Sequence, residues 1–141
     1  MILYLDASAL VKLYVEEPGS PALADEIERA TAVATARISY AEARAAFARL
    51  RREGRLSAAA LHRLVRDLDA DWPSLEVVEI TEGLVRRVGA LAERHDLRAY
   101  DAIQLAAGLE LRRAGAQTAF AAFDQNLNRA ARREGLQLAP S

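Results

Sequence analysis

The sequence has no cysteine, which excludes disulfide bonds, zinc–thiolate centres and cysteine nucleophiles at once. It is also almost without lysine, because Lys12 is the single lysine among 19 basic residues and the rest are arginine. No apolar run approaches the roughly 18 residues that a membrane-spanning helix needs. The apolar start at residues 1–5 has no basic segment before it, so we expect no targeting signal. These absences favour a soluble protein, and we expect a cytoplasmic location.

The chain is long enough for one domain with a substantial hydrophobic core. It has 141 residues, of which 52% are hydrophobic, so we expect a single domain over residues 1–141. Its net charge of −1 argues against a protein that binds nucleic acid through an overall basic surface. Its arginines nevertheless suit bidentate contacts with phosphate groups.

Short apolar runs alternate with longer helical stretches along the chain. We expect buried strands at about residues 2–5, 31–38, 75–80, 118–123 and, more weakly, 136–138. Helices are expected at about residues 7–15, 21–30, 39–53, 57–72, 81–95 and 99–114, with a short one after residue 124. Strands that alternate with helices imply right-handed crossovers, so the predicted fold class is α/β with a parallel sheet covered on both faces.

Four acidic residues stand where predicted strands end or predicted helices begin. Asp6 directly follows the first strand, and Asp124 directly follows the fourth. Glu42 and Asp101 fall in the first turns of two predicted helices. Each has a structural explanation: Ser39 and Glu42 form a capping-box pattern, and the others suit helix N-caps or the positive end of a helix dipole.

The expected topology brings these four positions together. In a parallel α/β sheet, helices that follow strands begin at one edge, which is where ligands usually bind. Four carboxylates at one edge would repel one another and raise one another's pKa. A divalent cation removes this conflict, and an all-oxygen ligand set favours Mg²⁺ or Mn²⁺ over zinc.

Four segments carry a resemblance to a known family, in the family's order and spacing: Leu3–Tyr14, Ser39–Glu42, Tyr100–Ala107 and Phe123–Leu127. With them the chain resembles the PIN-domain nucleases and, within these, the VapC-type toxins of toxin–antitoxin pairs. The resemblance spans nearly the whole chain. It implies a three-layer α/β/α, Rossmann-like fold with four or five parallel strands in the order 3-2-1-4-5, which sets the first and fourth strands side by side.

The resemblance also implies a metal-dependent endoribonuclease with a defined acidic site. Asp6, Glu42, Asp101 and Asp124 would be its catalytic residues, with Ser8 in support. Our hypothesis is that the three aspartates bind Mg²⁺ or Mn²⁺, directly or through water, while Glu42 positions or deprotonates the attacking water or holds a second ion. By resemblance the leaving group is a 3′-hydroxyl, the partners are an RNA substrate and a cognate antitoxin, and the protein is a homodimer.

Several basic residues are candidates for other contacts. Arg37, Arg44 and Arg98 lie closest in sequence to the acids, so they are predicted, with Ser8, to bind RNA. Lys12 is expected to pair with Glu16 one helical turn on, and not to take part in catalysis. The two histidines, His62 and His95, stand in charged stretches and are expected at the surface.

One position departs from the family's pattern. Many relatives carry a threonine two residues before the last acid, and this chain has Ala122 there. A hydroxyl that could orient Asp124 or contact substrate is therefore missing. Asn126 and Asn128 are candidates to supply polar contacts in its place.

Three alternatives remain open. A haloacid dehalogenase-like hydrolase expects a second aspartate where Ser8 stands, and a late catalytic lysine. A receiver domain expects an acceptor aspartate after the third strand, where Ile80 and Thr81 stand, and also a late lysine, but Lys12 is early. The third alternative is a PIN fold that has lost activity and serves as a binding module, against which the presence of all four acids argues.

Overall fold

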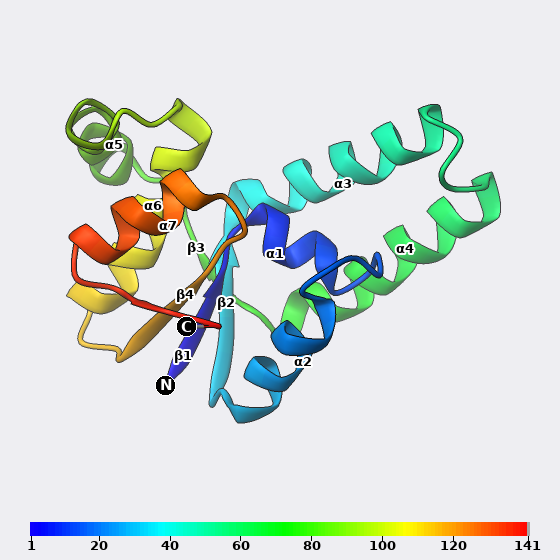
Figure 1. The fold of residues 1–141 in the computed structure, drawn as a ribbon, viewed down its shortest axis with the longest axis horizontal. Coiled ribbons are helices and arrows are strands. Elements are labelled where there is room, and N and C mark those ends of the chain that lie inside the picture. Colours follow the sequence, from blue (N-terminus) through cyan, green and yellow to red (C-terminus); the bar gives the residue numbers. More distant parts are fainter. Residues whose placement is uncertain (141) are drawn as a thin grey trace.

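A five-stranded parallel sheet forms the centre of the molecule in the computed structural model, which describes residues 1–140 (Figure 1). Its strands are β1 (Ile2–Leu5), β2 (Ala32–Ala36), β3 (Glu76–Val78), β4 (Thr118–Ala121) and β5 (Gln137–Leu138). All neighbouring strands pair in parallel, in the order β3-β2-β1-β4-β5. The predicted fold class and strand order are confirmed.

Helices cover both faces of the sheet. They are α1 (Ala7–Lys12), α2 (Ser20–Arg29), α3 (Arg37–Arg52), α4 (Ala58–Asp71), the short 3₁₀ helix η1 (Trp72–Ser74), α5 (Glu82–His95), α6 (Ala99–Arg113) and α7 (Gln125–Arg133). One hydrophobic core lies between the sheet and α1 to α4, and the other lies between the sheet and α5 to α7. In Figure 1, α3 and α4 extend together as a long antiparallel pair away from the sheet.

The alternation of side chains along β1 explains the two cores. Leu3 and Leu5 point into the core with α1 to α4, whereas Tyr4 between them points into the core with α5 to α7. All three are fully buried, and the Tyr4 ring stacks on Phe120 of β4 with ring centroids 5.4 Å apart. A central strand that is covered on both faces needs apolar side chains on both of them. This is why the strand shows no alternation of polar and apolar residues.

Helix starts agree with the sequence at four positions and disagree at one. Asp6, Ser57, Thr81 and Asp124 each accept a hydrogen bond from a backbone N–H of the helix that follows, as N-caps do. The predicted capping box at Ser39 is wrong, because α3 begins at Arg37 and Ala36 is its N-cap residue. Ser39 is instead buried inside the helix, and Gln104 Nε2 donates to its hydroxyl at 3.0 Å.

The first helix is shorter than its apolar pattern suggests. It ends at Lys12 rather than near Val15, because the Ser20 hydroxyl donates to the Lys12 carbonyl at 3.1 Å and satisfies the helix end. The expected pair between Lys12 and Glu16 is consequently absent, and the Lys12 ammonium lies 3.9 Å from Glu17 Oε2 instead.

The expectation that both histidines lie at the surface is half right. His62 is exposed. The His95 side chain is only 4% exposed, and its Nε2 lies 2.6 Å from Glu134 Oε2. Glu134 follows α7, so a residue distant in sequence covers the imidazole, which no local pattern indicates.

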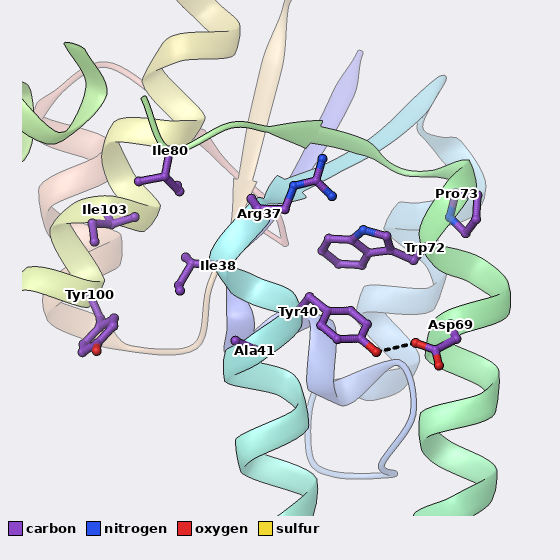
Figure 2. A pocket seen from close by; sticks show the side chains of 10 residues that line it. All are labelled: Arg37, Ile38, Tyr40, Ala41, Asp69, Trp72, Pro73, Ile80, Tyr100 and Ile103. Carbon is purple, nitrogen blue, oxygen red and sulfur yellow. Dashed lines mark hydrogen bonds between the residues drawn. The ribbon is translucent and has the colours of Figure 1, made fainter. Parts of the chain in front are cut away.

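An apolar cleft of about 770 Å³ opens between the first turns of α3 and α6, the end of α4 and η1 (Figure 2). Figure 2 shows Ile80, Ile103 and Tyr100 on one side, with Tyr40 and Trp72 on the other. The rings of Tyr40 and Trp72 meet edge to face, with centroids 5.3 Å apart. Across residues 1–140, no helix has the length and apolar composition that crossing a bilayer requires.

Candidate active site

A second, polar cleft of about 310 Å³ lies at the carboxyl ends of β1 and β4. Its lining residues come from the segments after β1 and before α7 and from helices α3 and α6: Asp6, Ala7, Ser8, Glu42, Arg98, Asp101, Gln104, Phe123 and Asp124. All four predicted acids therefore meet here, together with Ser8 and Arg98. We call this the acid cleft.

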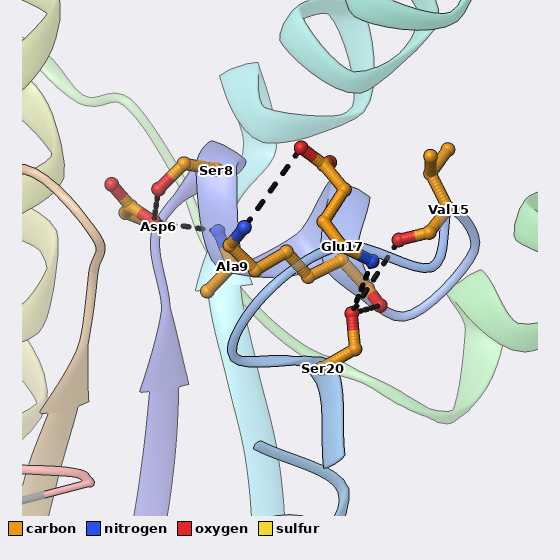
Figure 3. A network of polar contacts seen from close by, with 7 residues as sticks. Asp6, Ser8, Ala9, Val15, Glu17 and Ser20 are labelled. Atoms are coloured by element: carbon orange, nitrogen blue, oxygen red, sulfur yellow. Dashed lines mark hydrogen bonds and ion pairs between the residues drawn. The ribbon is translucent and has the colours of Figure 1, made fainter. Parts of the chain in front are cut away.

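Asp6 is the most deeply buried of the four acids, with 6% of its surface exposed. Its backbone N–H donates to the Ala121 carbonyl at 3.0 Å, which ties the residue to β4. Its Oδ1 accepts from the Ser8 hydroxyl at 2.7 Å and from the Ala9 N–H at 2.9 Å, as Figure 3 shows. Both of these hydrogen bonds end on Oδ1, so they leave Oδ2 without either contact.

Glu42 is held by a buried amide rather than by the start of its helix. Gln104 of α6 is 2% exposed, and its Nε2 donates to Glu42 Oε1 at 2.9 Å. The Tyr4 hydroxyl donates to Gln104 Oε1 at 2.5 Å, which turns the amide so that its NH₂ group faces Glu42. This chain of hydrogen bonds links β1, α6 and α3 across the core and fixes one oxygen of Glu42.

Asp101 and Asp124 lie nearer the solvent. Asp101 stands in the first turn of α6, where the helix dipole favours a negative charge. Its Oδ2 lies 3.6 Å from Nε of the exposed Arg98. Asp124 is the N-cap of α7, and its Oδ1 accepts from the Leu127 N–H at 2.9 Å. Both aspartates thus have a structural role that leaves one oxygen free of these contacts.

The electrostatics of the acid cleft oppose full ionisation of the carboxylates. The pKa of Asp6 is raised from 3.8 to about 6, chiefly by burial and also by the charges of Glu42 and Asp101, against the lowering effect of the hydrogen bonds from Ser8 and Ala9. Burial also raises the pKa of Glu42 and of Asp101. Repulsion by Asp101 adds to the rise at Glu42, and repulsion by Asp124 adds to the rise at Asp101. The four acids therefore act on one another as a single negative cluster.

The donor set suits a hard, partly hydrated cation. Every acidic group in the cleft offers carboxylate oxygens, which Mg²⁺ and Mn²⁺ prefer, and a cation would relieve the repulsion that raises these pKa values. In the part of the chain that the structure describes, no three acidic or histidine side chains converge tightly enough to surround an ion directly. Water would have to complete the coordination shell, as it usually does around Mg²⁺.

Two of the predicted RNA-binding arginines lie outside the acid cleft. Arg37 lines the apolar cleft and forms a bidentate pair with Glu79, at 3.0 Å from Nε to Oε1 and 2.6 Å from Nη2 to Oε2. Arg44 donates from Nη1 to the Tyr40 hydroxyl at 2.8 Å. Of the three predicted arginines, Arg98 is the one that lines the acid cleft. The structure thus separates side chains that neighbour the acids only in sequence.

Ala122 places no hydroxyl two residues before Asp124, and its contacts are those of a core residue. The Ala122 side chain is buried in the core beside α7, and its carbonyl accepts from Asn128 Nδ2 at 2.8 Å. Asn128 therefore braces the backbone two residues before Asp124. Asn126 accepts from Arg129 Nη2 at 2.9 Å, and neither asparagine lines the acid cleft.

Sequence reasoning missed Gln104 and Phe123, which also line the acid cleft. Gln104 stands three residues after Asp101 on the same helix, so both occupy one face of α6. A polar residue in the otherwise apolar segment 102–107 was the available signal. Phe123 directly precedes Asp124, but an apolar residue at a strand end carries no signal of exposure.

Comparison with known proteins identifies the family to which the chain belongs. The PIN domain model matches residues 3–133, and the chain belongs to the PIN-domain family. This membership replaces the two phosphoryl-aspartate alternatives, the dehalogenase-like hydrolase and the receiver domain.

Several similar proteins cover more than nine-tenths of the chain. It is 34% identical over 140 residues to Ribonuclease VapC45 of Mycobacterium tuberculosis, covering 99% of this chain and 96% of the relative. The crystal structure of M. tuberculosis VapC20, a sarcin–ricin loop cleaving toxin, superposes with a TM-score of 0.66 at 20% identity, over 91% of this chain and 94% of that one. VapBC2 from Rickettsia felis, bound to a promoter DNA fragment, superposes with a TM-score of 0.68 at 15% identity, over 98% of this chain and 97% of that one. The two solved structures support the fold.

Proposed function

We propose that this protein is a metal-dependent endoribonuclease that hydrolyses RNA phosphodiester bonds, of the kind that serves as the toxin of a toxin–antitoxin pair. The observation that carries the proposal is the meeting of Asp6, Glu42, Asp101 and Asp124 in one cleft, from four distant parts of the chain. Its support is the relative over nearly the full length that is named a ribonuclease. A binding module without activity would have no use for four mutually repelling carboxylates.

Asp6, Asp101 and Asp124 are the residues that would hold Mg²⁺ or Mn²⁺. When bound, such an ion neutralises charge on the phosphate and supplies a water nucleophile at neutral pH. The hydrogen bonds of Asp6 and Asp124 to backbone N–H groups fix these carboxylates before any ligand arrives. This preorganisation avoids the cost of ordering the side chains during the reaction.

The other residues of the cleft have roles that follow from their contacts. Glu42, whose pKa is raised by burial, can accept a proton from the attacking water. Gln104 holds Glu42 in place through Nε2. Arg98 is exposed at the rim beside Asp101, where its guanidinium can contact a phosphate of the RNA. Ser8 positions Asp6 and is close enough to the cleft to meet the substrate.

Cleavage of RNA by the purified protein tests this proposal. We expect cleavage with Mg²⁺ or Mn²⁺, none with EDTA, and a loss of at least about 100-fold in Asp6→Asn and Asp101→Asn. Ser57→Ala is the control, because it removes a helix cap on α4 that lies outside the acid cleft. Undiminished cleavage with EDTA and in both aspartate variants would contradict the proposal. Metal binding without cleavage of any RNA would favour the inactive module.

We infer that an antitoxin is the protein partner and that the apolar cleft is where it docks. A solved toxin–antitoxin complex from Klebsiella pneumoniae contains a chain with a similar fold, and Tyr100, which is 61% exposed, lines the apolar cleft next to Asp101 in sequence. An apolar helix or tail of the antitoxin would bury Tyr100, Ile103 and Trp72 close to the acids. Ile103→Glu should weaken antitoxin binding by at least about tenfold. Binding equal to the wild type would place the partner elsewhere.

Two further expectations belong to this proposal. We propose a homodimer, which sedimentation of the purified chain without antitoxin tests, since a monomer at micromolar concentration would contradict it. We also propose a cytoplasmic location, where RNA is available as substrate, and cell fractionation tests it.

A further inference from the structure

Phe123 is an exposed aromatic residue in the wall of the acid cleft. It directly precedes Asp124, and 36% of its surface is exposed, although its ring is apolar. Four large hydrophobic residues are this exposed in the part of the chain that the structure describes: Leu13, Val85, Tyr100 and Phe123. Of these, Phe123 alone lines the acid cleft. Its exposure therefore coincides with the place where the substrate must bind.

The orientation of the Phe123 ring is fixed by its neighbours. The Lys12 ammonium lies over one face of the ring, 4.6 Å from the centroid. Gly19 approaches the ring edge so closely that a Cβ at this position would lie 2.6 Å from Phe123 Cε1. Gly19 also has φ +97°, a conformation that other residues adopt with strain. The ring is thus held by two separate segments of the chain before any ligand binds.

Lys12 is largely committed to this arrangement. Its side chain is 11% exposed and lies between the Phe123 ring and Glu17, 3.9 Å from Glu17 Oε2. The single lysine of the chain therefore covers one face of the ring, while 36% of the residue's surface stays exposed. An apolar ring that its neighbours hold in place, in a partly exposed residue of the cleft wall, offers a surface on which a planar ligand can stack.

The chemistry of the expected substrate matches such a surface. RNA-binding proteins stack unpaired bases on aromatic side chains, and loss of one such contact weakens binding by about tenfold or more. We propose that Phe123 is a stacking platform for the base of a nucleotide next to the scissile phosphate. The proposal rests on the nuclease function above and extends it: the acids act on the phosphodiester, and Phe123 binds the base beside it.

Stacking can be measured directly with an RNA that carries the fluorescent base 2-aminopurine. Short RNAs with the fluorescent base at successive positions around the cleavage site are titrated with the Asp101→Asn protein, which is expected to bind RNA without cutting it. We expect quenching at one position, and its loss together with about tenfold weaker binding when Phe123→Leu is added. Phe123→Trp should retain binding, because the larger ring also stacks. Leu13→Ala is the control, since Leu13 is similarly exposed but lies outside the cleft.

An abasic nucleotide at the quenched position separates stacking from indirect damage to Asp124. If Phe123 acts through the base, removing the base from the RNA should weaken binding of the protein with Phe123 about tenfold and leave the Phe123→Leu protein unaffected. The proposal would be overturned if Phe123→Leu weakened binding to the intact RNA and to the abasic RNA by the same factor. It would also be overturned if Phe123→Leu bound the intact RNA as tightly as the protein with Phe123. Failure of the proposed nuclease function would look different, because Asp6→Asn and Asp101→Asn would then cut RNA as well as the wild type does.

Discussion

Asp6 is a buried carboxyl group in a position that favours its neutral form. Burial raises its pKa to about 6, although the Ser8 hydroxyl and the Ala9 N–H both stabilise the ionised form. A helix cap would not require this cost, because asparagine or serine caps equally well without charge. A buried carboxylate that destabilises the folded protein is typical of a cation-binding site, because the bound cation stabilises the ionised carboxylate.

This conflict predicts how stability depends on pH in the absence of metal. The unfolded carboxyl ionises near pH 3.8 and the folded one near pH 6, so the stabilisation from Asp6 is fully present below about pH 4 and is lost as pH rises to about 6. Asp6→Asn keeps an acceptor for Ser8 and Ala9 without the charge. At pH 7.5 in EDTA it should be more stable than wild type by roughly 1–3 kcal/mol. Denaturant unfolding at pH 4 and 7.5 checks this; a pH-independent difference would contradict it.

Gln104 connects the hydrogen bonds of the core to those of the acid cleft. Gln104→Met would leave the buried Tyr4 hydroxyl without its acceptor, at a cost of about 1–3 kcal/mol in unfolding free energy. Adding Tyr4→Phe removes that stranded hydroxyl and should recover part of this stability, because the buried Ser39 hydroxyl still lacks its donor Gln104. Cleavage should stay low in both proteins, because Glu42 has lost its donor. Thermal unfolding and RNA cleavage are measured together, and activity that returns with stability would show that Gln104 matters only for folding.

At the scale of elements, α7 shows how one residue can serve both the fold and the site. Asp124 begins this helix by accepting from the Leu127 N–H, and it also lines the acid cleft. The charge and the cap can be separated, because asparagine caps a helix about as well as aspartate while alanine does not.

Asp124→Asn should therefore retain stability and lose cleavage, whereas Asp124→Ala should lose cleavage and about 1 kcal/mol of unfolding free energy. Thr81→Ala offers the matched comparison, since Thr81 caps α5 by the same kind of bond to the Leu84 N–H and does not line the acid cleft. It should lose stability alone. Full cleavage by Asp124→Asn would assign Asp124 to the helix and remove it from the site.

Helix α3 shows where local patterns mislead. The capping-box pattern of Ser39 and Glu42 predicted a helix start at Ser39, but tertiary contacts decide otherwise. The helix begins at Arg37, and Ser39 turns inward to Gln104. The prediction that Glu42 belongs to the site was therefore right, but the local structure expected around it was wrong. Its side chain is held by Gln104, which lies more than 60 residues away in the sequence.

At the scale of the whole molecule, the α/β class with a parallel sheet followed from the sequence pattern, whereas the strand order came from the family resemblance. Five short apolar segments alternate with helices, and the family resemblance supplied the order that sets β1 beside β4. The positions of Asp6 and Asp124 follow from that order alone. The amide of Gln104, the burial of His95 by Glu134 and the separation of Arg37 from the acids depend on contacts between distant segments, which a single sequence does not reveal.

The central claim is that the acid cleft binds a hard divalent cation on which RNA cleavage depends. Crystals soaked in Mn²⁺ and measured by anomalous scattering test it most directly. We predict an anomalous peak in the acid cleft within reach of Asp6, Asp101 or Asp124, completed by water and absent from crystals of Asp6→Asn. A cleft without manganese at millimolar concentration, in a protein that nevertheless cuts RNA, would contradict the account.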